Sequence, residues 1–103
     1  MTDLKLESKV TGDAASVIVR GEVDMATAPQ LREELTGLVD AGVTTLVLDC
    51  RELQFLDSSG IGVLIAVHKL LDNSGSLTLE APPAHVRKVL DLTGVSDHVT
   101  ITS

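Results

Sequence analysis

The sequence predicts an α/β fold, a single small domain over residues 1–103 in which a mixed β-sheet is packed with about three to four α-helices. The first segments alternate apolar and polar residues, as half-buried strands do. Later short aliphatic runs are separated by segments whose apolar residues recur at helical spacing. The residues are 44% hydrophobic, so a chain of this length can bury an aliphatic core. The order β-β-α-β-α-β-α-β predicts parallel neighbours joined by right-handed crossovers.

Two strands are predicted at the start of the chain. Residues 4–10 alternate between apolar or small side chains and charged ones. Residues 11–13, Thr-Gly-Asp, supply turn chemistry, and the glycine accepts a positive φ. A second alternating run covers residues 17–23 and is interrupted by Gly21. The two runs predict a hairpin or an adjacent pair of strands.

The first helix is predicted to begin at Thr27, as the N-cap residue, and to end at Gly42. Gln30 stands three residues after Thr27, as in a capping box. Pro29 is tolerated in the first turn because the N–H groups there have no intrahelical partner. Gly42 offers a left-handed cap at the end. One apolar stripe joins Leu31, Leu35, Leu38 and Val39.

The remaining elements follow in sequence order. Residues 44–48 form an apolar run without alternation, which predicts a strand covered on both faces. After it we expect a helix over about 58–72, a strand at 76–79, a helix from Pro82-Pro83 to Gly94, and a short strand at 99–101.

Composition excludes several classes of function. With 8 basic and 15 acidic residues the formal net charge is −7, and one Phe is the single aromatic residue, so we expect no nucleic-acid partner. Cys50 is the single cysteine and ends an apolar run, which predicts a buried structural thiol. The first residues do not resemble a signal peptide, and the longest apolar run, residues 61–67, is too short to cross a bilayer. We expect a cytoplasmic protein that does not insert directly into a membrane.

Catalytic and cofactor motifs are missing from the sequence. His68, His85 and His98 match no metal-ligand spacing, and neither a Gly-x-Gly-x-x-Gly motif nor a Walker loop is present. We therefore expect neither a metal nor a cofactor. An enzyme that uses Ser58 with His68 or His85 ranks last among the hypotheses, because nothing in the sequence aims a base at the serine.

The segment over residues 56–63, Leu-Asp-Ser-Ser-Gly-Ile-Gly-Val, carries the most information about function. It follows a buried strand and opens a helix, so Asp57 or Ser58 is expected to be the N-cap. Gly60 and Gly62 keep the first turn slim, either for local packing or for the close approach of another backbone. The helix is apolar on two sides, so its second stripe is either packed by a neighbouring helix or part of an interaction surface: Val63, Ala66, Val67 and Leu70.

Three segments in order resemble one family. The segment Asp57-Ser58-Ser59-Gly60-Ile61-Gly62 resembles the phosphorylation-site motif of the STAS-domain anti-sigma factor antagonists. The segment Gly21-Glu22-Val23-Asp24 is similar to their upstream signature, and Asp91-Leu92-Thr93-Gly94-Val95 to their C-terminal helix segment. The similarity runs from about residue 4 to residue 101, so the resemblance implies a STAS domain over essentially the whole chain.

The resemblance implies a regulatory switch that acts by binding another protein. In this family the unphosphorylated antagonist binds an anti-sigma factor that is also a serine kinase, which releases the sigma factor. The kinase switches the antagonist off by phosphorylating the serine after the motif aspartate, here Ser58, and a phosphatase resets it. Ser59 is the competitor for the acceptor role. The partner-binding residues implied by motif position are Asp24, Thr27, Asp57, Ser58, Ser59, Gly60 and Gly62.

Two other functions remain open for the same fold. The domain is either a scaffold within a signalling assembly or the cytoplasmic STAS subunit of a lipid transporter. A small-molecule or nucleotide binder is a third hypothesis, but without a phosphate loop the nucleotide of the switching reaction belongs to the kinase. The serine in the motif favours the phosphorylation switch.

Overall fold

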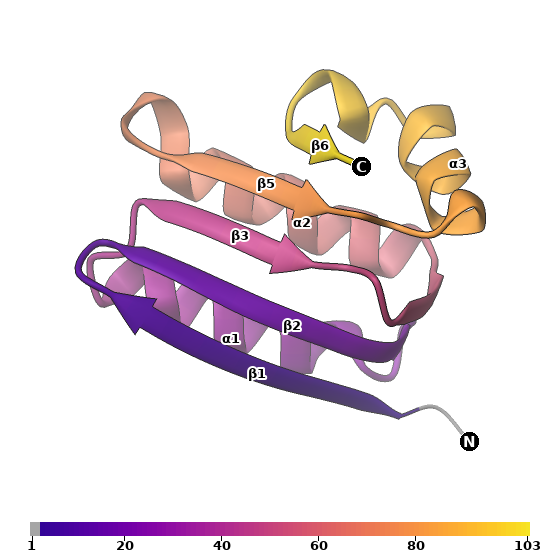
Figure 1. The fold of residues 1–103 in the computed structure, drawn as a ribbon, viewed down its shortest axis with the longest axis horizontal. Coiled ribbons are helices and arrows are strands. Elements are labelled where there is room, and N and C mark those ends of the chain that lie inside the picture. Colours follow the sequence, from indigo (N-terminus) through magenta and orange to yellow (C-terminus); the bar gives the residue numbers. More distant parts are fainter. Residues whose placement is uncertain (1–2) are drawn as a thin grey trace.

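The computed structural model describes residues 3–103, which form a mixed six-stranded sheet and three α-helices (Figure 1). This confirms the predicted fold class. The strands span Leu4–Thr11 (β1), Ala14–Val23 (β2), Thr45–Asp49 (β3), Leu53–Leu56 (β4), Ser76–Glu80 (β5) and Thr100–Thr102 (β6). The helices span Ala28–Asp40 (α1), Ser58–Leu71 (α2) and Ala84–Leu92 (α3), and short 3₁₀ turns span Asp72–Ser74 and Val95–Asp97.

The strand order is β1-β2-β3-β5-β6, with β4 paired to β2 beyond the end of β3. The predicted hairpin is confirmed, because β1 and β2 pair antiparallel in a register that sets Leu6 opposite Val19. Every other pairing is parallel, as the alternation of strands and helices predicts. At Gly21 the β2–β4 register shifts, φ is +107°, and a β-carbon would collide with the carbonyl oxygen of Asp3. This position of the upstream signature therefore requires glycine.

The prediction missed strand β4. Its end residues, Leu53 and Leu56, are buried, whereas Gln54 and Phe55 between them are exposed. This pattern follows neither strand alternation nor helical spacing, because the irregularity at Gly21 interrupts the pairing with β2. A segment of four residues without an alternating apolar pattern cannot be recognised as a strand from the sequence alone.

The sheet is covered on one face, so the prediction that residues 44–48 are covered on both faces is wrong. Helices α1 and α2 lie behind the sheet in Figure 1, and its front face is open. In β3, Leu46 and Leu48 are buried, but Val47 on the opposite face is only half-buried. The chain steps in one direction across the sheet, from β2 through β3 and β5 to β6. When the connections between parallel strands are all right-handed, this order places every helix on the same face of the sheet.

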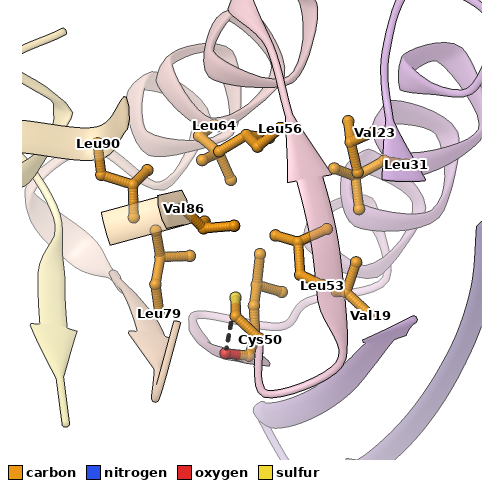
Figure 2. A pocket seen from close by; sticks show the side chains of 11 residues that line it. Val19, Val23, Leu31, Cys50, Leu53, Leu56, Leu64, Leu79, Val86 and Leu90 are labelled. Atoms are coloured by element: carbon orange, nitrogen blue, oxygen red, sulfur yellow. Dashed lines mark hydrogen bonds between the residues drawn. The ribbon is translucent and has the colours of Figure 1, made fainter. Parts of the chain in front are cut away.

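The core between sheet and helices is aliphatic (Figure 2). The void at its centre holds about 10 Å³, room for no more than one water molecule, and side chains such as Val86 and Leu90 line it. Cys50 lies at this void and is 2% exposed, which confirms the predicted buried thiol. Burial raises the pKa of the Cys50 thiol to about 12, and the charge of Asp49 adds to the rise. The thiol is therefore neutral and inert at physiological pH.

Helix α1 covers most of the second apolar stripe of α2. Val63 and Val67 are buried where the two helices pack together, and Ala66 is half-buried. Leu70, near the end of the stripe, is 52% exposed. Packing by a neighbouring helix, the first of the two predicted alternatives, therefore accounts for most of this surface.

Candidate functional site

The two acidic motifs meet at one edge of the sheet. Strands β2 and β4 are parallel, with Val23 opposite Leu56, so Asp24 and Asp57 follow directly from paired residues. The backbone N–H of Asp57 donates to the carbonyl oxygen of Val23 over 3.2 Å. Segments far apart in the sequence are thus brought together where the carboxyl ends of the strands lead into α1 and α2.

Asp57 is the N-cap of α2. Its Oδ1 accepts a hydrogen bond from the backbone N–H of Ser59 at 2.9 Å, and its backbone is extended. Both features are typical of an N-cap aspartate, which confirms the prediction that Asp57 or Ser58 opens the helix. The cap fixes Ser58 as the first residue of α2.

A network of hydrogen bonds fixes the loop between β2 and α1. Asp24 Oδ1 accepts from the backbone N–H of Ala26 at 2.8 Å and of Thr27 at 3.2 Å. The Thr27 hydroxyl donates to the carbonyl oxygen of Glu22 at 2.8 Å and accepts from the backbone N–H of Asp24 at 3.0 Å. Thr27 is buried, so its part is to hold Asp24 and the start of α1 in place.

The predicted capping box between Thr27 and Gln30 is wrong. Thr27 is the N-cap residue, but its side chain makes no capping hydrogen bond and its backbone is already helical. Its hydroxyl instead donates to the carbonyl oxygen of Glu22 and accepts from the backbone N–H of Asp24. Gln30 Nε2 instead donates to the carbonyl oxygen of Leu4 at 3.1 Å, which ties α1 to β1. These competing partners, the carbonyl oxygens of Glu22 and Leu4 and the N–H of Asp24, lie outside the helix, so the spacing within the helix does not reveal them.

The two serines of the motif differ in accessibility. Ser58 is exposed and Ser59 is half-buried. Both border a shallow hollow of about 370 Å³ between the first turns of α1 and α2, close to Met25, which is 80% exposed. The hollow is lined by Met25, Ala28, Pro29 and Arg32 from the loop and α1, and by Ser58, Ser59, Gly62 and Val63 from α2.

The two glycines of the motif have different surroundings. Gly60 is buried, and a β-carbon there would overlap Leu56 Cδ1 and lie 2.7 Å from Val23 Cγ1. Gly62 is exposed and open to the hollow, with nothing within 4 Å of a β-carbon. Local packing explains Gly60, whereas Gly62 leaves the surface beside Ser58 free of a side chain.

Four residues that line the hollow were not predicted as site residues, and Val63 was predicted only as a member of the second apolar stripe of the helix: the four are Met25, Ala28, Pro29 and Arg32. Helical spacing places Pro29 and Arg32 on one face of α1, but only the packing of α1 against α2 shows that this face borders Ser58. The position of Met25 directly after the upstream signature was the one available signal.

The histidines lie outside this hollow. The rings of His68 and His98 are 5.9 Å apart between centroids and border a separate hollow, and His85 Nε2 lies 2.6 Å from the carbonyl oxygen of Gln54. Within residues 3–103, three or more His, Cys, Asp or Glu side chains nowhere gather into a group that could hold a metal ion. Over the same residues, each helix is too short or too polar to span a membrane.

Comparison with known proteins gives the family. The model of the STAS domain matches residues 5–103, so the chain belongs to the STAS domain family. The anti-sigma-B factor antagonist of Bacillus subtilis (strain 168) is 29% identical over 102 residues, covering 98% of this chain and 93% of that protein. An anti-sigma factor antagonist from Mycobacterium paratuberculosis matches with a TM-score of 0.89 and 26% identity, over 97% of this chain and 86% of that one.

A further solved relative is known in two states. The anti-sigma factor antagonist SpoIIAA in its unphosphorylated form matches with a TM-score of 0.82 and 27% identity, over 98% of this chain and 89% of that one. Bacillus SpoIIAA in the phosphorylated form matches with a TM-score of 0.73 and 26% identity, over 98% and 92%. The fold described above is therefore shared with antagonists in both phosphorylation states.

Proposed function

We propose that the chain is an anti-sigma factor antagonist that acts as a phosphorylation switch. Its unphosphorylated form binds an anti-sigma factor serine kinase and releases the sigma factor, and phosphorylation of Ser58 ends that binding. The observation that carries the proposal is the exposed Ser58 hydroxyl at the first position of α2, beside a hollow edged by the exposed Met25. The named relatives are antagonists, and one is known in a phosphorylated form.

Ser58 is the better acceptor of the two serines. Residue Ser58 is exposed, so its hydroxyl is accessible to a kinase, whereas Ser59 is half-buried. In the transfer, Ser58 Oγ bonds to the γ-phosphorus of ATP while the bond from that phosphorus to ADP breaks. The hydroxyl proton passes to a base of the kinase. The chain itself needs no cofactor for this step.

The fold tolerates the added group, but a docked partner does not. A phosphoryl group adds about −1.5 to −2 charges, and the start of α2 offers backbone N–H groups and the positive end of the helix dipole. A partner that covers this turn meets the new charge next to Asp57. Like charges brought together at an interface cost on the order of several kcal/mol. Phosphorylation therefore weakens binding to the partner without any refolding of the domain.

The implied partner-binding residues divide into two groups. Ser58 and Gly62 are exposed, and Asp24, Asp57 and Ser59 are half-buried, so these five form the surface that the kinase contacts. Thr27 and Gly60 are buried and act by holding that surface in shape. A phosphatase that removes the phosphoryl group restores binding. An ATP-dependent kinase partner also implies a cytoplasmic location.

The proposal is tested by intact-mass analysis after incubation with ATP and host-cell extract. We expect one phosphoryl addition to the parent protein and to the matched control Ser59→Ala, and none to Ser58→Ala. Labelling of Ser58→Ala to the parent level would refute Ser58 as the acceptor. If the parent stays unlabelled while a control substrate is labelled in the same extract, the scaffold or lipid-transporter function replaces the switch.

Binding is tested with the kinase captured from that extract on the unphosphorylated protein. Ser58→Glu should bind this kinase more weakly than the parent and keep a thermal midpoint close to it, because position 58 is exposed. Equal affinity of Ser58→Glu and the parent would contradict the electrostatic basis of the switch.

A further inference from the structure

One arginine stands apart from the others in its surroundings. Arg20, Arg51 and Arg87 each form an ion pair with a nearby carboxylate. Arg32 is exposed and forms no ion pair within residues 3–103. It lines the hollow that Ser58 borders, and it is the single charged side chain there among the described residues. An arginine without an ion pair among the described residues thus lines the same hollow as the proposed acceptor serine.

We propose that Arg32 binds the phosphoryl group of Ser58 in the phosphorylated protein. The inference rests on the proposed function only for the existence of that phosphoserine. Helix α1 packs against α2, and Arg32 follows Ala28 and Pro29 on the face of α1 that lines the hollow. The guanidinium carries five N–H donors in a planar fork that matches phosphate oxygens. The phosphate is therefore held between the two helices and does not extend freely into solvent.

Arg32 is a positive charge in mainly acidic surroundings. The chain carries a formal net charge of −7, and Asp57 lies next to Ser58 in sequence. Asp24 follows Val23, the β2 residue paired with Leu56, and is another acidic residue at this edge of the sheet. Both carboxylates disfavour a phosphate dianion, whereas Arg32 favours it. The second pKa of the phosphoserine, ordinarily about 6, reports the balance between them.

The test uses protein that carries phosphoserine at position 58, inserted during translation so that no kinase is needed. The pKa of its phosphate is measured by ³¹P NMR titration in the parent, in Arg32→Gln and in the matched control Arg20→Gln. Arg20 follows the buried Val19 on β2, so its side chain points to the open face of the sheet, away from the hollow. Arg20→Gln therefore removes the same charge from a distant place.

We expect the phosphate pKa to rise by about half a unit to one unit in Arg32→Gln and to stay unchanged in Arg20→Gln. The difference should shrink at 1 M salt, because this contact is open to solvent, and Arg32→Lys should keep part of the shift. The same pKa in Arg32→Gln and the parent, or an equal rise in both glutamine variants, would overturn the proposal. Neither result bears on whether a kinase recognises Ser58, and a failed kinase assay leaves this titration valid.

Discussion

Replacing Gly60 with alanine should destabilise the domain, whereas the same change at Gly62 should stabilise it. The two residues lie in the first turns of α2, so the intrinsic gain from alanine in a helix is similar at both. They differ in what the new methyl group meets. At Gly60 it overlaps Leu56 Cδ1 and lies 2.7 Å from Val23 Cγ1, and at Gly62 it meets nothing within 4 Å.

These contacts determine how much stability each substitution changes. Carbon atoms pack best about 3.5–4.0 Å apart, so Val23 must move away by about 1 Å, although it is fully buried and β-branched. Overpacking of this kind costs about 1–3 kcal/mol, and the helix propensity of alanine offsets at most about 1 kcal/mol. We expect Gly60→Ala to lose about 1–2 kcal/mol, a fall in Tm of about 5–10 °C for a domain of this size. Gly62→Ala should gain about 0.5–1 kcal/mol.

Urea unfolding followed by far-ultraviolet circular dichroism measures both changes. The parent, Gly60→Ala and Gly62→Ala are compared under one buffer condition. A Gly60→Ala variant as stable as the parent would refute the close packing of α2 on β2 and β4. The Gly62→Ala variant also tests the proposed function, because its methyl group enters the hollow beside Ser58. It should weaken kinase binding while the domain becomes more stable.

Two other predictions concern the cap of α2 and the buried thiol. Asp57→Ala should lose about 1 kcal/mol in urea unfolding because the N–H of Ser59 loses its acceptor, whereas Asp57→Asn keeps an acceptor and should stay within about 0.5 kcal/mol of the parent. Equal losses in the two variants would mean that the charge matters more than the cap. Cys50 should resist a thiol reagent at pH 8 until the domain unfolds, since its pKa is raised from 9.0 to about 12. Above pH 9 the unfolded chain loses this thiol proton while the folded chain keeps it, so stability should fall with pH more steeply in the parent than in Cys50→Ala. Parallel pH profiles for the two proteins would contradict the raised pKa.

Local patterns in the sequence were enough for most of the elements. Alternation predicted the β1–β2 hairpin, and the start of α2 at Ser58 matches the prediction. The buried thiol of Cys50 was predicted from the apolar run before it. The two acidic motifs, and the two serines that follow Asp57 in the second of them, were also found in the sequence. Each of these features depends on residues that are close together in the sequence. A pattern read along the chain is therefore enough to predict it.

Contacts between distant segments were decided by the tertiary structure. Strand β4 was not predicted because the irregularity in β2 disturbs its alternation of buried and exposed residues. The open face of the sheet follows from the strand order and from the handedness of the connections between parallel strands. The hydroxyl of Thr27 bonds to Glu22 and Asp24 instead of capping α1.

The sequence by itself determined which residues form the motif, and the tertiary structure decided what surrounds them. Gly60 and Gly62 look equivalent in the sequence, but the packing of α2 on the sheet buries one and leaves the other open. Arg32 is an ordinary surface arginine until α1 packs beside α2 and brings it to the hollow at Ser58. The physical reason is that backbone hydrogen bonding and periodicity act locally, whereas burial and electrostatic surroundings arise only when separate elements come into contact.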